Sequence, residues 1–367
     1  MNVNQIIVDI MVVFMVLAAV DRCLGCPLDL GDKMDEALSA MGPMCIPMVG
    51  MFLMAPLLGQ FLSPLVSPLF QFFDADPAMF PNAILACDMG GYALARSMAL
   101  TPESARLSGC ILGCSLGGAI SFIIPVGIAM IRKDYHSYFA VGVLMGIVTV
   151  PLGLLVGGLS AGFSPSLVFR NTLPILVFSL LIALGLWKAQ RLCIKIFHVF
   201  GRLLTIVATA GFAIGIIQEL TPLTIVHGMP SVLEGIQVVG NVTIVLCGAY
   251  PMLHLLSKAL NKYIQRLGHI MGIDSNAITG MLGGLANTMP VLGACNRMSP
   301  AGLVVAMAFA VSGSCIFGDH LAFVASVDKS MIMPMILSKF VGSISAVIGA
   351  VLLCRRNHYP GEDNDQK

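Results

Sequence analysis

A carboxylate and a pair of glycines interrupt an apolar segment near residue 88. In the run NAILACDMGGYALARSM, which spans Asn82 to Met98, Asp88 stands among apolar side chains and is followed by Gly90 and Gly91. A carboxylate at membrane depth costs about 2.5–3.5 kcal/mol on insertion scales, and such residues usually mark a pathway or a binding site. Adjacent glycines break a helix, and broken backbone in a bilayer is tolerated where it faces protein or water. We therefore expect Asp88 to bind a cation and place Gly90 and Gly91 in the same substrate site. The alternative is a helix kink whose Asp is bonded to neighbouring backbone.

A second acidic group follows small residues in the run FAVSGSCIFGDHLAF, where Asp319 and His320 stand side by side. Asn287 and Thr288 belong to another broken stretch, NAITGMLGGLANTMPVLGAC. We predict that Asp319 faces Asp88 across a cation site and that the amide and the hydroxyl supply neutral oxygens. His320 could carry protons, because imidazole titrates near physiological pH. The alternative is that Asp319 and His320 satisfy each other as a structural pair.

Aromatic side chains lie near these groups in the sequence. An aromatic face attracts an ammonium ligand by about 0.5–2 kcal/mol. Tyr92 directly follows the glycine pair, and Tyr250, Phe122 and Phe323 are the next candidates. Each ring could instead pack in the core, and we include Tyr92 alone in the predicted substrate site.

The composition is that of a membrane protein. Hydrophobic residues make up 57% of the chain, and charged residues only 11%, against the ~25% usual for soluble domains. The net charge of +1 gives no reason to expect nucleic acid as a partner. The pattern Cys23-x-x-Cys26 lacks the second pair that a structural zinc site needs, so we predict no metal and no cofactor. The motif HExxH does not occur, which argues against an intramembrane metallohydrolase and favours a protein that is not an enzyme.

Apolar runs of about 20 residues, the length that crosses a bilayer as a helix, predict an all-α polytopic membrane protein with about nine to eleven transmembrane segments. The first run follows no basic residue and carries Asp9, so we expect a span and not a cleaved signal peptide. Pro64 and Pro68 argue against a straight crossing in FLSPLVSPLFQFF and favour an interfacial or re-entrant piece. The runs are Gln5–Val20, Ala37–Gly59, Leu107–Ile131, Tyr138–Leu159, Thr172–Trp187, Leu203–Ile217, Ile236–Leu256, Gly302–Val327 and Met331–Cys354.

The distribution of Lys and Arg decides whether the two broken stretches cross the membrane, since cytoplasmic loops collect basic residues. If both cross, the basic residues divide almost evenly. If both are re-entrant, fifteen fall on one side and four on the other, which favours re-entrant hairpins with the N-terminus outside and the C-terminus in the cytoplasm. The four are Arg96, Arg106, Arg170 and Lys329; the fifteen are Arg22, Lys33, Arg132, Lys133, Lys188, Arg191, Lys195, Arg202, Lys258, Lys262, Arg266, Arg297, Arg355, Arg356 and Lys367, and Lys339 lies inside a span.

An internal repeat relates the two broken stretches. A shift of 198 positions gives eleven identities among the 61 positions from 42 to 102, including Asp76 with Asp274 and Pro102 with Pro300. We predict a first repeat with a linking span in residues 1–190 (re-entrant stretch 75–99), a second in residues 199–354 (re-entrant stretch 274–298), and a polar cytoplasmic tail in residues 355–367. The two repeats would be inverted relative to each other, which is typical of transporters whose discontinuous helices meet at mid-membrane.

Four motifs in order carry a resemblance to a known family. LACDMGG at 85–91, GAYPM at 248–252, LANTMP at 285–290 and FGDHLAF at 317–323 resemble the ethanolamine-utilisation membrane protein family, EutH. The loops after the first span and around residues 160–171 and 218–235 are shorter than this resemblance leads us to expect. The resemblance implies a multi-pass protein of the bacterial cytoplasmic (inner) membrane that admits ethanolamine.

A small hydroxylated ammonium suits two carboxylates, amide oxygens and an aromatic face, so the residues and the resemblance indicate the same class of ligand. The alternative is a symporter that couples another small polar solute to H⁺ or Na⁺. The sequence leaves ion coupling and oligomerisation open.

Overall fold

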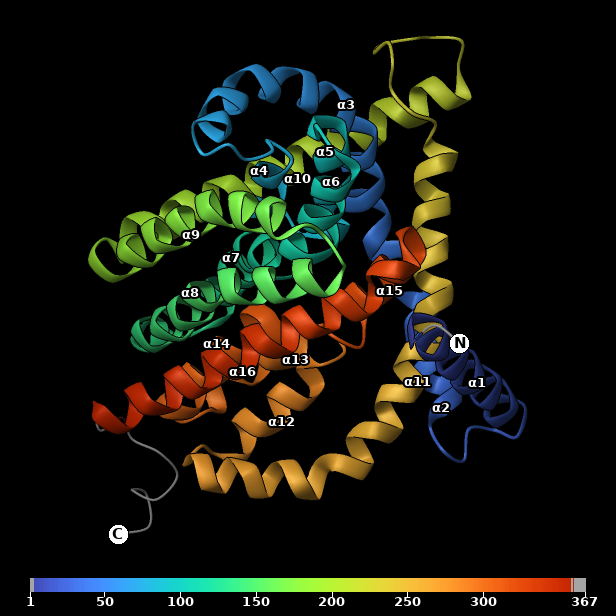
Figure 1. Cartoon of the computed structure of the whole chain (residues 1–367). Helices are drawn as coiled ribbons and strands as arrows, with labels where there is room; N and C mark the ends of the chain where they lie inside the picture. The colour runs from blue at the N-terminus through green and yellow to red at the C-terminus, as the bar shows by residue number, and fades with distance from the viewer. Residues whose placement is uncertain (1–2, 358, 360–367) are drawn as a thin grey trace.

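The computed structural model describes residues 3–357 and 359, which form helices with no strand among them (Figure 1). Eight helical segments in this part of the chain are long and apolar enough to cross a membrane. The predicted all-α polytopic class is therefore confirmed. The elements are α1 (Val3–Cys23), α2 (Leu30–Ser39), α3 (Met41–Phe72), α4 (Met79–Ile84), η1 (Cys87–Gly91), α5 (Tyr92–Met98), α6 (Pro102–Leu107), η2 (Ser108–Gly117), η3 (Ala119–Ile123), α7 (Ile124–Met130), η4 (Lys133–Tyr135), α8 (His136–Ser160), α9 (Pro165–Lys188), α10 (Gln190–Leu220), α11 (Val232–Met271), α12 (Ser275–Gly284), α13 (Met289–Ala294), η5 (Cys295–Arg297), α14 (Pro300–Gly313), α15 (Asp319–Val327), η6 (Lys329–Met331) and α16 (Ile332–Arg356).

Helix α3 is longer than the sequence predicts. It continues through Pro64 and Pro68 to Phe72, so no separate re-entrant piece forms there. Figure 1 shows the last turns of α3 curving away from its first part. Proline bends a helix because it removes one backbone hydrogen bond and its ring crowds the preceding turn. The prolines therefore redirect this helix without ending it.

In each broken stretch, the last residues lie beside the first ones. The Asp76 carboxylate accepts hydrogen bonds from the backbone N–H groups of Leu100 and Thr101, at 3.0–3.2 Å. The Asp274 carboxylate accepts from the N–H and the hydroxyl of Ser299, at 2.8 and 2.6 Å. An aspartate thus ties the start of each stretch to its end. We name residues 75–99 hairpin 1 and residues 274–298 hairpin 2.

The base of hairpin 1 lies at the end of the bundle where the chain begins, which we name the amino end. Arg106, one turn into the helix after hairpin 1, pairs with Asp328 at 2.6 Å. Close to Asp328, the carbonyl of Ser330 accepts a hydrogen bond from the side chain of Asn4 at 3.0 Å.

The base of hairpin 2 lies at the opposite end, which we name the carboxy end. The Asn296 amide donates to the carbonyl of Met130 at 2.9 Å, and Arg355 donates to the carbonyl of Ile270 at 3.1 Å. The helical run 102–130 therefore goes from the amino end to the carboxy end, and the run 300–327 goes in the reverse direction. The two hairpins enter the bundle from opposite ends.

The predicted span Gly302–Val327 is not one helix. It divides into α14 and α15, and residues 314–318 between them are not helical. The N–H groups of Cys315, Phe317 and Asp319 donate to the carbonyls of residues 284, 285 and 286, at 2.7, 3.0 and 3.3 Å. Because helix α12 ends at Gly284, these carbonyls would otherwise lack partners inside the bundle. The backbone carbonyls at the tip of hairpin 2 and the backbone N–H groups of the broken helix therefore form each other's hydrogen bonds.

Hairpin 1 packs against a row of glycines at 109, 113 and 117, one every four residues. A Cβ at Gly109 would overlap the ring of Tyr92, and one at Gly117 would overlap the carbonyl of Leu85. The small-residue face lets this helix approach the hairpin backbone closely.

Candidate functional site

The tips of both hairpins line one cavity of about 340 Å³. Hairpin 1 supplies Asp88, hairpin 2 supplies Asn287 and Thr288, and the start of α15 supplies Asp319 and His320. These five of the eight predicted site residues therefore meet in space. The volume is at the lower end of the range of small-molecule sites.

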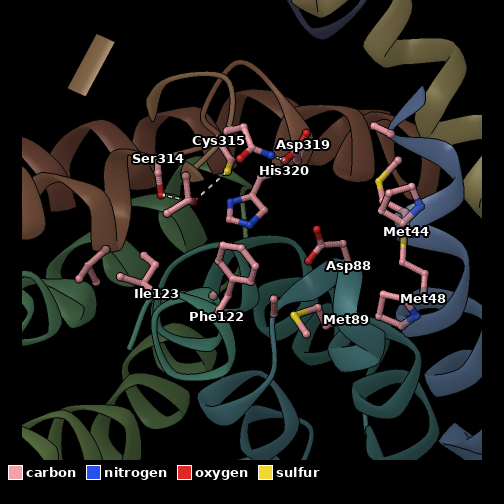
Figure 2. Close-up of a pocket in the computed structure, with 18 of the residues that line it drawn as sticks. Met44, Met48, Asp88, Met89, Phe122, Ile123, Ser314, Cys315, Asp319 and His320 are labelled. Atoms are coloured by element: carbon pink, nitrogen blue, oxygen red, sulfur yellow. Dashed lines mark hydrogen bonds between the residues drawn. The ribbon is translucent and has the colours of Figure 1, made fainter. Parts of the chain in front are cut away.

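Apolar side chains form the rest of the wall. Figure 2 shows Asp88 and His320 pointing into the cavity, with Met44 and Met48 of α3 along one side and Phe122 along another. Apolar walls exclude water and strengthen the electrostatic field of the carboxylates inside the cavity. The cavity thus combines a few polar groups with a surface that fits methylene groups.

Asp319 is held by two side-chain donors. The Tyr250 hydroxyl donates to Oδ1 at 2.8 Å, and the Asn287 amide donates to Oδ2 at 2.5 Å. The Asn287 carbonyl oxygen accepts from the N–H of Met289 at 2.8 Å, which fixes the orientation of the amide. Each carboxylate oxygen still has a second lone pair for a ligand. Tyr250 therefore supports the site through its hydroxyl, a role that its position in the sequence does not indicate.

Asp88 is positioned by the irregular backbone of the hairpin tip. Gly90 has φ +85°, a left-handed conformation that side chains disfavour, and it lies against Met51 of α3. Gly91 is helical, and its N–H and carbonyl bind Ala86 and Asn82. Gly91 therefore serves the close packing of the hairpin, and its backbone groups are engaged within the protein.

Tyr92 and Gly90 line a second cavity of about 580 Å³ toward the amino end. The ring of Tyr92 contacts Phe323 edge to face, with ring centroids 5.8 Å apart. This second cavity shares Asp88 and Met48 with the first. Asp88 therefore lines both cavities, whereas Tyr92 lines only the second one.

Lys339 is a functional candidate that sequence reasoning did not select. It is 0% exposed, and its ammonium donates to the carbonyl of Cys114 at 2.5 Å and contacts His320 Nδ1 at 3.1 Å. His320 itself is 7% exposed and separates Lys339 from the cavity. The available signal was a single Lys within an apolar span, which is costly in a membrane and calls for a partner.

Thr288 lines the cavity wall, and its hydroxyl is engaged behind it. The hydroxyl donates to Ser314 Oγ at 3.1 Å and contacts Cys315 Sγ at 3.4 Å. Thr288 therefore joins the tip of hairpin 2 to the broken helix as well as contributing to the cavity surface.

One group of side chains has the spacing of a metal site. The ligand atoms of Cys87, Asp88 and His320 lie within 4.8 Å of one another. The nearby Lys339 ammonium opposes a second cation there, and Cys87 Sγ is already in contact with Cys114 Sγ at 3.4 Å. The absence of a resident metal stays a prediction.

Comparison with known proteins gives one consistent family. The family model described as "Ethanolamine utilisation protein, EutH" matches residues 3–353. No solved structure matches the chain.

Three relatives are similar over nearly their whole length. A protein of Listeria monocytogenes serotype 1/2a (strain 10403S), named probable ethanolamine permease EutH, is 44% identical over 356 residues, covering 97% of this chain and 95% of that protein. The uncharacterized protein YxeR of Bacillus subtilis (strain 168) is 41% identical over 350 residues, 95% of each chain. The probable ethanolamine permease EutH of Salmonella typhimurium (strain LT2) is 36% identical over 391 aligned residues, 96% of each chain. On this match across nearly its full length, the chain belongs to the EutH family of ethanolamine utilisation proteins.

Proposed function

We propose that this protein is a permease for the uptake of ethanolamine. The observation that carries the proposal is the convergence of Asp88 and Asp319, from elements that enter the bundle at opposite ends, on one cavity. The names of the Listeria and Salmonella relatives support the same substrate. The ammonium of ethanolamine binds between the two carboxylates, because a buried carboxylate is costly without a cation or donor.

The hydroxyl of ethanolamine binds on the polar side of the same cavity. His320 and Asn287 supply hydrogen-bonding groups there, and the two methylene groups lie against Met44, Met48 and Phe122. Hydrogen bonds to the hydroxyl distinguish ethanolamine from a simple alkylamine of similar size, since an unpaired polar group in the site would be costly.

During transport, Asp88 becomes accessible alternately from the second cavity and from the first. The tip of hairpin 1 and Met48 lie where the cavities meet. The opposite directions of the two hairpins support an inverted-repeat architecture, in which residues 1–190 and 199–354 move relative to each other around a fixed site. Substrate enters through the cavity lined by Tyr92 and leaves through the cavity lined by Asp319.

The protein lies in the bacterial cytoplasmic membrane with its amino end outside. The excess of Lys and Arg in segments at the carboxy end supports this orientation. The tail after Cys354 then lies in the cytoplasm.

Ion coupling is a second proposal for the same protein. The position of Asp88 supports it, because a buried carboxylate that lines both cavities can bind a small cation or exchange a proton. In this alternative mechanism, H⁺ or Na⁺ moves together with ethanolamine or with another small polar solute.

Uptake of labelled ethanolamine into proteoliposomes tests these proposals. We expect saturable uptake that excess unlabelled ethanolamine abolishes and that empty liposomes lack. Imposing an H⁺ or Na⁺ gradient distinguishes facilitated diffusion, in which label only equilibrates, from coupled transport, in which label accumulates. Absence of protein-dependent uptake under every gradient would refute the ethanolamine permease.

A further inference from the structure

Lys339 is a buried charge that the proposed binding scheme does not use. It is 0% exposed, it lies on α16, and it does not line the cavity. A buried ammonium is costly unless it is paired and hydrogen-bonded. Its hydrogen-bond partners are neutral groups, the carbonyl of Cys114 and the ring of His320. The carboxylates that can balance its charge are therefore those on the other side of His320.

The contact with His320 fixes the charge of that ring. An ammonium donates hydrogen bonds and accepts none, so His320 Nδ1 is the acceptor and the ring is neutral with its proton on Nε2. The cavity region then holds two carboxylates, Asp88 and Asp319, and one ammonium, Lys339. With both carboxylates ionised and Lys339 protonated, its net charge is one negative unit.

The other charges near the cavities are engaged or solvated. Glu36 of α2 pairs with Lys33 at 2.6 Å at the protein surface. Arg96 is exposed and lies over the ring of Tyr92, 5.8 Å from its centroid. Exposed charges are screened by water and ions, whereas buried ones are not. The balance between Asp88, Asp319 and Lys339 therefore dominates the binding site.

We propose that Lys339 is a fixed internal cation that restricts the site to a cargo with a single positive charge. The proposal rests on the ethanolamine permease function and identifies the residue that sets its charge selectivity. With Lys339 in place, one ammonium neutralises the site, and a doubly charged amine would leave an excess positive charge in a low-dielectric cavity. Without Lys339, two positive charges are needed for neutrality, so a small diamine becomes the better ligand.

Competition between two amines of matched size tests this inference. The probe is 1,2-diaminoethane, which replaces the hydroxyl of ethanolamine by a second amine and carries two charges at mildly acidic pH. We compare its potency with that of unlabelled ethanolamine in blocking uptake of labelled ethanolamine, in wild type, Lys339→Gln and Lys339→Met. The expected result is a gain of about tenfold or more in the relative potency of the diamine in both variants, equivalent to ~1.4 kcal/mol. Lys329→Gln, which removes an exposed Lys near the amino end, should leave the ratio unchanged.

A second readout separates this inference from the proposed function. Thermal stabilisation of the detergent-solubilised protein by each amine reports binding without transport. If wild type fails to transport ethanolamine but the diamine still stabilises the Lys339 variants preferentially, the permease proposal fails and the charge rule stands. An unchanged diamine preference in folded Lys339→Gln and Lys339→Met overturns the charge rule.

Charge compensation keeps the test decisive if the single variants do not fold. The double variant Asp319→Asn, Lys339→Gln restores one net negative charge. We expect it to insert and to be stabilised by ethanolamine more than Asp319→Asn alone. No gain in the double variant over Asp319→Asn contradicts the proposal.

Discussion

At the scale of single residues, the two carboxylates are held in different ways. Asp319 receives hydrogen bonds from Tyr250 and Asn287, whereas no side chain in the described part of the chain donates to Asp88. Asp88 instead depends on the hairpin backbone for its position, and in the proposed scheme Lys339 and a bound cation balance its charge. The two acids therefore contribute differently, although both face the same cavity.

Replacing either acid by its amide should abolish most transport without unfolding the protein. Asp88→Asn and Asp319→Asn keep the size of the side chain but remove the charge that binds an ammonium. We expect uptake per inserted molecule to fall about 10–100-fold, since a hydrogen bond to a charged group contributes about 1.5–3 kcal/mol. The control is Asp134→Asn, an exposed acid in η4, which should transport normally. Normal uptake by Asp88→Asn would show that the central site is misplaced.

At the scale of elements, each hairpin is positioned at its base and at its tip. The bases are tied by Asp76 and Asp274, which the 198-residue shift places in register. At the tip of hairpin 1, Gly90 has φ +85°, whereas Thr288, which the same shift aligns with it at the tip of hairpin 2, has φ −68°. The repeats thus share their bases and differ at their tips, where the chemistry differs as well.

An alanine at each of two hairpin glycines should give opposite results. Gly90→Ala places a side chain at positive φ, which costs about 1–2 kcal/mol, and its Cβ would overlap Met51. Gly293→Ala meets no atom within 4 Å and should stabilise its helix by up to about 1 kcal/mol. Thermal unfolding in detergent measures both. Equal stability of the two variants would mean that the bend at Gly90 does not constrain hairpin 1.

At the scale of the whole molecule, the helices define two ends that carry different charge. The amino end includes Arg106 and Asp328, and the carboxy end includes Ile270 and Arg355. The structure links residues at each end by hydrogen bonds, and the proposed orientation places the carboxy end in the cytoplasm because cytoplasmic segments collect Lys and Arg.

Cysteine labelling in intact cells should place three exposed positions on the expected sides. On a background without the native cysteines, Lys329→Cys should react with a membrane-impermeant maleimide added outside. Lys262→Cys and Asn357→Cys should react only after the membrane is permeabilised. External labelling of Lys262→Cys together with protection of Lys329→Cys would reverse the proposed orientation.

The sequence by itself determined the class of protein and the two acidic candidates. Asp88 and Asp319 stand out because a carboxylate in an apolar run is costly and therefore rare. The breaks around them were also predictable, since glycine disfavours the interior of a helix. These signals are local, so they need no knowledge of which helices are neighbours.

The tertiary structure decided which other residues join those acids. Tyr250 reaches Asp319 across 69 positions, and Lys339 reaches Cys114 across 225. Tyr92, adjacent in sequence to the glycine pair, turns instead toward the second cavity. In a chain this apolar, the hydrophobic pattern does not separate lipid-facing from buried helix faces, because lipid tails and the protein core are similarly apolar. Only the packing of the helices therefore determines which side chains meet at the site.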